Sequence, residues 1–197
     1  LEMADIFPDW VAKRSQEGFD IDKYLLWSLK RPPLWIRLCG GPARDGEFAG
    51  TGAEFSPHPR LANAVRVSAP SLNIYDMETF KKGRFEVQDA ASQCVSVICA
   101  PAPGQRWWDA CAGGGGKTLH MAELMNSRGT ILSTDLREHK LDDLKKRARR
   151  HNYSNIRCDE WDGGSAGRNR ERSFDGVLVD APCTCSGTWR RNPDAKW

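Results

Sequence analysis

A glycine-rich loop is the stretch of this sequence best suited to chemistry. "WDACAGGGGKTLHMAEL" covers residues 108–124 and places four consecutive glycines between an apolar run and a helical pattern. Free backbone N–H groups at a helix N-terminus bind anions, so the loop predicts a site for a phosphate or a carboxylate. Gly116-Lys117-Thr118 matches the end of a triphosphate-binding loop, but Cys111 stands where that loop opens with glycine. A P-loop-like nucleotide hydrolase is therefore one interpretation.

Aspartates follow the apolar runs that we interpret as strands. A single aspartate after a strand is usually a turn residue or a helix cap, but four in register suggest a binding edge. Asp135 follows the glycines by about 20 residues, the spacing used to bind a ribose diol. Leu119 interrupts the glycine spacing of a dinucleotide fingerprint. Carboxylates around the site favour a sugar and a cationic group, as in S-adenosylmethionine, and the series is Asp109, Asp135, Asp162 and Asp180.

Strands alternate with helices in the second half of the chain. This order predicts an α/β fold with a parallel sheet and right-handed crossovers, whose fourth strand, "FDGVLVDAPC", reads as apolar and buried. Residues 1–82 read as a small α+β domain, with a helix over 8–33, a strand at 34–40 and loop over 40–60. The predicted domains are therefore 1–82 and 83–197.

Composition sets limits on the class of protein. The 197 residues carry a formal net charge of +3 and seven cysteines of scattered spacing, which predicts reduced thiols in a cytoplasmic protein. Cys183 and Cys185 are spaced too closely for a usual zinc half-site, and we expect no metal. No apolar run approaches a membrane span of ~20 residues, and the start does not resemble a secretory signal. We expect a monomer, and the basic stretches 136–152 and 167–173 predict either solvated faces or a phosphate-facing surface.

Three motifs together resemble one family. "DACAGGGGKT", "VQDAASQ" and "DAPCTCSGTWRRNPDAKW" are similar to the RsmB/Nop2/Sun family of RNA cytosine-5 methyltransferases, from about Pro8 to Trp197 and most strongly after Arg84. One departure is visible, because the family usually has Ala-Pro-Gly-Gly-Lys where this chain has residues 113–117. Gly114 takes the place of the proline, which frees the loop backbone.

The resemblance implies a fold and a cofactor site. The fold would be a Rossmann-like S-adenosylmethionine-dependent methyltransferase sheet, truncated after the fourth strand and preceded by a small α+β RNA-binding domain. Asp135 would take the ribose, Asp162 would lie by the adenine, and Asp180 would lie near the methyl group and the target base. The methionine end of the cofactor would be lined by Cys111, Ala112, Gly113, Gly114, Gly115, Gly116 and Lys117.

The resemblance also implies a covalent mechanism. A thiolate that adds to carbon 6 of cytosine activates carbon 5 for methylation, and a protonated Asp180 would assist the addition. In the family the nucleophile lies in a later Thr-Cys motif, and the Pro-Cys thiol, here Cys183, assists product release. Cys185 follows a threonine but lies within the Pro-Cys loop, so we do not give it the nucleophile role. We expect the complete protein to be active and residues 1–197 alone to be inactive; a buried structural thiol is the alternative for Cys183.

The substrate follows from the same resemblance. Phosphate contacts are expected from Arg190, Arg191 and Lys196, and ribosomal RNA is favoured over transfer RNA as the partner. The target base must leave its stack to reach a thiol. A non-catalytic RNA-binding relative with the same fold is the second alternative.

Overall fold

The computed structural model describes residues 7–13, 17–68, 72–164, 173–192 and 194. The chain forms two compact units, one made of Leu1–Pro33 with Pro182–Trp197 and the other of Leu34–Ala181. The domain boundary predicted after residue 82 falls inside the second unit, between α4 (Glu78–Lys81) and β4 (Phe85–Val87). The division into domains 1–82 and 83–197 stays a prediction.

The first unit contains short helices from both ends of the chain. The sequence predicts one helix over 8–33, but the structure has two, α2 (Asp9–Lys13) and α3 (Ile21–Ser28). Gly18, with a φ of 81°, lies between them, and the Asp20 carboxylate caps α3 by accepting the Lys23 N–H at 2.9 Å. The later segment contains the 3₁₀ helix η3 (Ser186–Thr188). Its core is a cluster of Phe7, Val11, Leu25 and Trp189.

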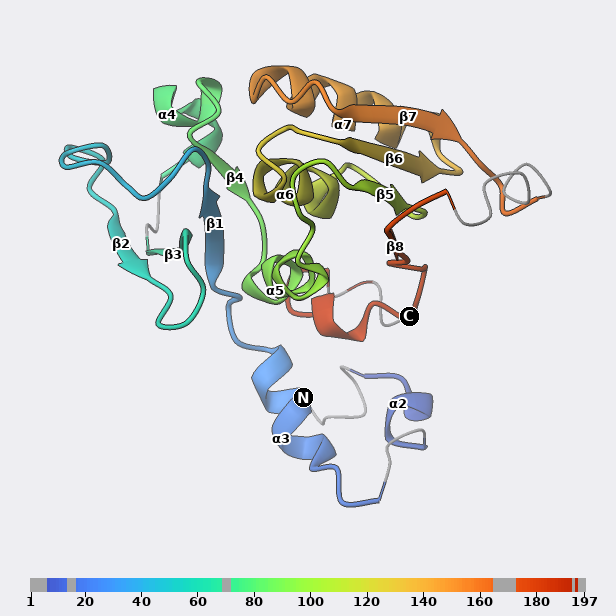
Figure 1. The fold of residues 1–197 in the computed structure, drawn as a ribbon. Coiled ribbons are helices and arrows are strands. Elements are labelled where there is room, and N and C mark those ends of the chain that lie inside the picture. Colours follow the sequence, from blue (N-terminus) through green and yellow to red (C-terminus); the bar gives the residue numbers. More distant parts are fainter. Residues whose placement is uncertain (1–6, 14–16, 69–71, 165–172, 193, 195–197) are drawn as a thin grey trace. The chain divides into compact units, whose positions relative to one another are not determined.

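An antiparallel sheet opens the second unit. Its strand order is β2-β3-β1-β4 (Figure 1). One face buries an apolar cluster that includes Ile36, Val67 and Phe85. The prediction of loop throughout 40–60 was wrong at β2, because Phe55 of β2 stacks on Phe48 with ring centroids 4.3 Å apart while its backbone pairs with β3. The elements here are β1 (Leu34–Leu38), β2 (Glu54–Pro57), β3 (Ala64–Ser68), η1 (Ile74–Asp76), α4 and β4.

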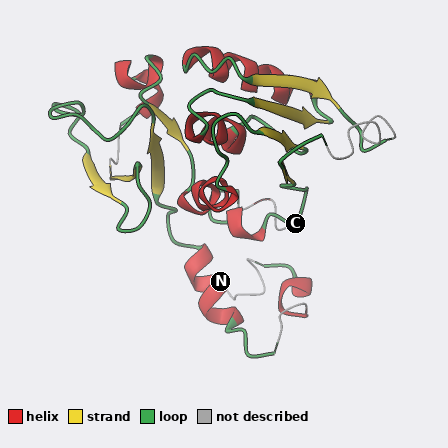
Figure 2. Ribbon diagram, in the orientation of Figure 1, coloured by secondary structure: helices red, strands yellow, loops and turns green. Residues whose placement is uncertain are grey.

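A parallel sheet with helices follows in the same unit (Figure 2). The strand order is β7-β6-β5-β8 and every pairing is parallel, so the predicted α/β Rossmann-like class is confirmed. Asp89 caps α5 by accepting the Ala91 N–H at 2.9 Å, and α5 ends at Cys99, before Pro101. The elements are α5 (Ala90–Cys99), β5 (Arg106–Asp109), α6 (Gly116–Leu124), β6 (Thr130–Asp135), α7 (Glu138–Arg150), β7 (Ile156–Glu160) and β8 (Gly176–Leu178).

Helices α6 and α7 pack on the same face of this sheet. Ile156 of β7 contacts both the cluster built on Met121 of α6 and the cluster built on Leu144 of α7. The expectation of a buried fourth strand was wrong for β8. Leu178 is buried against α6, but Val177 and Val179 are 51% and 62% exposed. Side chains alternate between the faces of a strand, and β8 has only β5 beside it in the described sheet.

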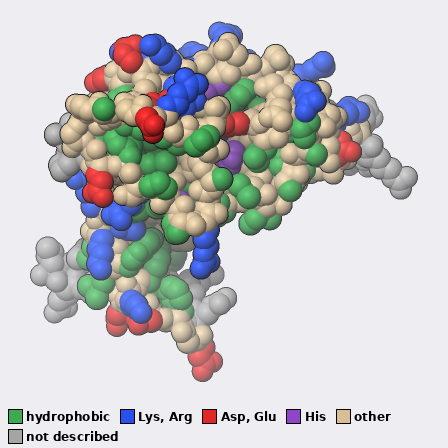
Figure 3. All heavy atoms as spheres, turned by 60° about the vertical axis from the view of Figure 1, so that its left-hand side comes forward, with side chains coloured by type: hydrophobic (Ala, Val, Ile, Leu, Met, Phe, Trp, Pro, Cys, Tyr) green, Lys and Arg blue, Asp and Glu red, His purple; other side chains and the backbone are tan. Residues whose placement is uncertain are grey.

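Charged side chains are spread over the surface. On the face drawn in Figure 3, Lys and Arg side chains are scattered among acidic and hydrophobic ones. None of the helices in the described part of the chain is both long and apolar enough to span a membrane.

Candidate functional site

The parallel strands bring the predicted aspartates to one edge of the sheet. Asp109 and Asp135 are the last residues of β5 and β6, while Asp162 and Asp180 each follow closely after β7 and β8. Because all four strands run parallel, these residues come at the same, C-terminal edge. Ligands of open α/β sheets bind at this edge, so it is the candidate site.

The glycine loop connects β5 to α6 at that edge. Gly113 and Gly115 have φ angles of 53° and 83°, which favour glycine. A Cβ on Gly115 would lie 2.1 Å from Leu144 Cδ1, so the loop backbone approaches α7 where no side chain fits. Helix α6 begins at Gly116, and the N–H groups of its first turn have no preceding helical carbonyls to bind. The loop therefore offers backbone donors to an anion.

Asp135 is held beside the loop. Its carboxylate accepts the Gly113 N–H at 2.8 Å and, from Arg137, the backbone N–H and Nε, both at 3.0 Å. Burial raises the pKa of Asp135, but these hydrogen bonds outweigh it, and the pKa is lowered. An ionised carboxylate is purely an acceptor, the chemistry that a pair of ribose hydroxyls needs.

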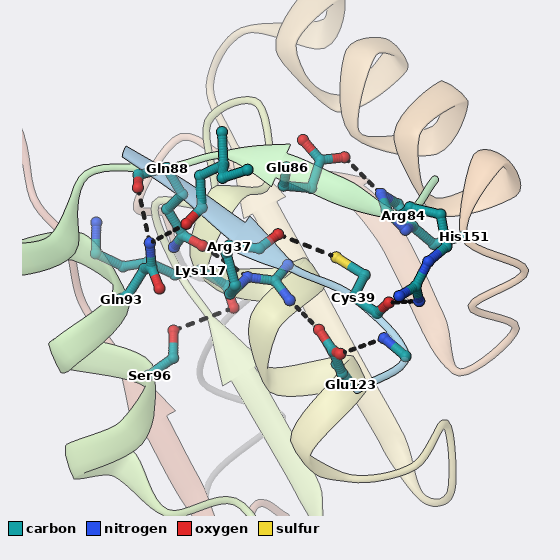
Figure 4. Close-up of polar contacts among 12 residues, drawn as sticks. Arg37, Cys39, Arg84, Glu86, Gln88, Gln93, Ser96, Lys117, Glu123 and His151 are labelled. Atoms are coloured by element: carbon teal, nitrogen blue, oxygen red, sulfur yellow. Dashed lines mark hydrogen bonds and ion pairs between the residues drawn. The ribbon is translucent and has the colours of Figure 1, made fainter. Parts of the chain in front are cut away.

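Lys117 and Asp180 form an ion pair across the site. Lys117 Nζ lies 2.6 Å from Asp180 Oδ2, which joins the first turn of α6 to the segment after β8. Asp180 remains 57% exposed. The Lys117 backbone carbonyl accepts the Ser96 hydroxyl of α5 at 3.4 Å (Figure 4). The structure thus brings two of the predicted site residues together.

Asp162 lies next to an aromatic pair that sequence reasoning missed. Trp161 and Trp108 have ring centroids 4.7 Å apart, and Trp108 Nε1 donates to Thr134 Oγ1 at 3.0 Å. Asp162 is exposed and accepts the Gly164 N–H at 2.8 Å. Tryptophans in apolar strands are usually interpreted as core residues, and no sequence spacing indicated that Trp108 and Trp161 form a pair at the site.

Asp109 lies deeper in the same region. It is 1% exposed and accepts the Thr118 hydroxyl of α6 at 2.6 Å. Burial raises its pKa to about 6, although the Thr118 hydrogen bond and the Lys117 charge oppose the shift. The sequence indicated its place at a strand end but gave it no role. Burial raises the pKa of Cys111 as well, and Asp135 and Asp109 add to the shift.

The remaining predicted residues that the structure describes lie in the first unit. Cys183 is exposed, which overturns the alternative of a buried structural thiol, and its Sγ accepts the Cys185 N–H at 3.3 Å. Arg190 donates to the carbonyls of Lys30 and Arg31 at 3.1 and 2.7 Å.

The Arg190 guanidinium also lies 4.1 Å from the Trp27 ring centroid. Its Nε, its Nη2 and one of its faces are therefore already in contact with other groups of the chain. Arg191 is exposed, and Lys196 lies outside the described residues.

A buried polar network that the sequence did not indicate lies between β1 and α6. Arg37 is 1% exposed; its Nε donates to Gln88 Oε1 at 2.9 Å and its Nη1 pairs with Glu123 (Figure 4). Glu123 also accepts the Gly40 N–H at 2.8 Å. Arginine and glutamate are rarely buried, so residue type alone favours solvent exposure, and only the tertiary structure shows this network.

The chain matches known methyltransferases. A family model described as 16S rRNA methyltransferase RsmB/F matches residues 96–197. Ribosomal RNA small subunit methyltransferase B of Salmonella paratyphi A is 32% identical over 98% of this chain and 46% of its own length. The protein of Salmonella typhi bearing the same name gives the same figures. The chain therefore spans about half the length of these curated relatives.

Solved structures agree on the fold. The crystal structure of PH0851 covers 100% of this chain and 47% of its own, with a TM-score of 0.90 and 29% identity. NSun6 from Pyrococcus horikoshii with SFG covers 92% of this chain and 72% of its own, with a TM-score of 0.78 and 17% identity, which supports the fold.

The match to a methyltransferase family model supports S-adenosylmethionine as the cofactor. The donors at the sheet edge fit it, since they combine helix N-terminal N–H groups for a carboxylate with the ionised Asp135 for a ribose.

Proposed function

Because this chain belongs to the RsmB/F family of 16S rRNA methyltransferases, we propose that the whole protein methylates carbon 5 of a cytosine in RNA. The observation that carries the proposal is the position of the glycine loop, Asp135 and Asp180 at one edge of the parallel sheet. Ribosomal RNA is the favoured substrate because the similar Salmonella proteins bear the names of ribosomal RNA methyltransferases. A cytoplasmic monomer is the form that we propose.

The cofactor would be held by the residues of this edge. The backbone of residues 111–117 and the start of α6 bind the carboxylate of the methionine end, with Asp135 on the ribose and Asp162 by the adenine amino group. S-adenosylmethionine supplies a methyl group on a positively charged sulfur, which is electrophilic. Trp161 offers an apolar surface beside Asp162.

Cysteine and carboxyl chemistry would activate the base. A thiolate would add to carbon 6 of cytosine, which makes carbon 5 nucleophilic towards the methyl group that the cofactor supplies. Once carbon 5 carries the methyl group, a base would remove the carbon-5 proton and the bond between the thiol and carbon 6 would break. To assist the addition, Asp180 would have to be released from Lys117 and carry a proton that it can donate to the base. Cys183 is exposed, as a thiol that assists product release must be. Arg190, Arg191 and Lys196 would contact phosphates.

The proposal is tested with the full-length protein, unmodified small-subunit ribosomal RNA and S-adenosylmethionine labelled in the methyl group. We expect label at carbon 5 of cytosine, and we expect Cys183→Ser to accumulate a covalent protein–RNA adduct because product release is slowed. Magnesium-dependent ATP binding without S-adenosylmethionine binding would instead favour a nucleotide hydrolase. Cofactor binding without methyl transfer would favour a non-catalytic RNA-binding relative.

The 197 residues by themselves should bind the cofactor without turnover. The nucleophile implied by the family resemblance lies in a Thr-Cys motif after the Pro-Cys motif, and these residues contain Thr-Cys only at Thr184–Cys185. Methyl transfer to RNA is therefore measured with residues 1–197 beside the full-length protein. Robust turnover by residues 1–197 would contradict this expectation.

A further inference from the structure

Helix α7 donates a hydrogen bond to the glycine loop through the side chain of Arg147. Arg147 Nη1 donates to the carbonyl of Gly114, and its Nη2 donates to Glu86 Oε2 at 2.9 Å. Glu86 belongs to β4 of the antiparallel sheet, so one guanidinium connects that sheet, α7 and the loop. The planar fork of an arginine suits two acceptors held at a fixed separation.

Glu86 is a fixed anchor for this guanidinium. Its side chain is 4% exposed and also accepts from Arg150 and from His151 Nε2, the latter at 2.6 Å. Glu86 and His151 are drawn in Figure 4. Burial raises the pKa of Glu86, but His151, Arg147 and Arg150 outweigh it and lower the pKa to about 2. The anchor therefore remains negatively charged over the working pH range.

The loop needs such an anchor because of its composition. Four consecutive glycines have much backbone freedom, which a bound ligand must remove at a cost in affinity. Within the loop, Asp135 holds the Gly113 N–H, and the Gly115 N–H donates to the Ala112 carbonyl at 2.9 Å. The carbonyl of Gly114 lies between these two contacts, and Arg147 holds it from outside the loop.

We propose that Arg147, anchored on Glu86, is a positioning residue that holds the glycine loop in the conformation that binds S-adenosylmethionine. The inference rests on the proposed function, since it assigns the loop to that cofactor. Arg147 contacts the loop backbone from the side of α7 and acts on the cofactor through it. Its role is to lower the entropy that the loop loses on binding.

The test compares variants of the 197-residue chain by calorimetric titration with S-adenosylmethionine, alongside thermal unfolding. Arg147→Met should raise the dissociation constant about tenfold, the scale of one hydrogen bond to a charged group. Arg147→Lys keeps a positive charge near Glu86 but is unable to span both acceptors, so it should lose affinity with little change in Tm. Arg150→Met is the matched control, because it removes another guanidinium from Glu86 without touching the loop.

A second substitution separates loop order from general stability. Gly114 has no φ in the left-handed region, and a Cβ there would lie 3.5 Å from Arg147 Nη1, an ordinary contact. Proline limits the backbone, so Gly114→Pro combined with Arg147→Met should recover most of the lost affinity.

Equal affinity in the wild type and both Arg147 variants would overturn the inference while leaving the proposed function intact. An equal loss in Arg150→Met, or failure of Gly114→Pro to rescue, would also overturn it. Absence of S-adenosylmethionine binding by the wild type would overturn the proposed function, and the inference with it.

Discussion

Asp109 shows how the environment of one residue sets its protonation. The carboxyl group is enclosed between β5 and α6, with the Thr118 hydroxyl as its hydrogen-bond donor at 2.6 Å. Burial raises the pKa from 3.8 to about 6. Compared with the unfolded chain, the folded state therefore favours the protonated form of Asp109. Ionisation of this carboxyl group lowers the free energy of unfolding.

The sign of the effect gives a pH-dependent prediction for Asp109→Asn. The ionisation penalty is absent below pH 3.8, grows as pH rises towards 6, and is complete above that value. The asparagine carries no charge and still accepts from Thr118, so the variant should exceed the wild type in unfolding free energy by about 3 kcal/mol at pH 7.5. The gap should be much smaller at pH 4. Urea unfolding at both pH values measures it, and an equal gap at both would contradict the burial argument.

Gly115→Ala tests the close approach of the loop to α7. The new methyl group would lie 2.1 Å from Leu144 Cδ1, and the φ of 83° disfavours any side chain. Backbone or α7 must move, so we expect a loss of about 2–4 kcal/mol in unfolding free energy and weaker S-adenosylmethionine binding. Gly104→Ala is a control for backbone strain alone, since Gly104 has a φ of 93° but nothing within 4 Å of its Cβ. Equal losses in the two variants would mean that packing against Leu144 contributes nothing.

At the scale of elements, local sequence patterns predicted where the strands of the parallel sheet end. Asp135 ends β6 as expected because apolar runs and turn residues mark strand ends, and parallel strands must share an edge. The prediction of burial failed for the fourth strand, where Val177 of β8 and Val179 directly after it are exposed, because strand order decides which strand has a neighbour. The pairing of Arg147 with Glu86 joins residues far apart in sequence, and no periodicity specifies it.

Glu86→Gln tests the link between β4 and α7. The folded pKa of about 2 lies below the ordinary 4.5, so the carboxylate contributes stability that is present above pH 4.5 and lost as pH falls towards 2. The wild type should lose about 3 kcal/mol across this window from Glu86 alone. The glutamine variant should have a lower free energy of unfolding than the wild type at pH 7. Its free energy of unfolding should also fall less than that of the wild type as the pH is lowered. Chemical unfolding from pH 7 to 2.5 gives both curves, and parallel curves would exclude Glu86 as the titrating group.

At the scale of the whole molecule, two segments distant in sequence share one core. Trp189, 3% exposed, packs with Phe7, Val11 and Leu25, and the Tyr24 hydroxyl donates to the Ser186 carbonyl at 2.8 Å. The predicted domains 1–82 and 83–197 assign these two segments to different domains, because neither segment has a sequence pattern that specifies contact with the other. The Pro-Cys loop is thus joined to the first helices rather than only to β8, which precedes it.

Trp189→Ala should destabilise the first unit without changing cofactor binding by the second. Removing the indole leaves a cavity beside Phe7 and Leu25, which costs about 3–5 kcal/mol and should unfold the first unit. The second unit contains the glycine loop, Asp135 and Lys117. The affinity of the Trp189→Ala variant for S-adenosylmethionine should therefore remain near the wild-type value. Hydrogen exchange should show lost protection in residues 21–28 with β5 and β6 unchanged. A large fall in the affinity of Trp189→Ala for S-adenosylmethionine would contradict this expectation.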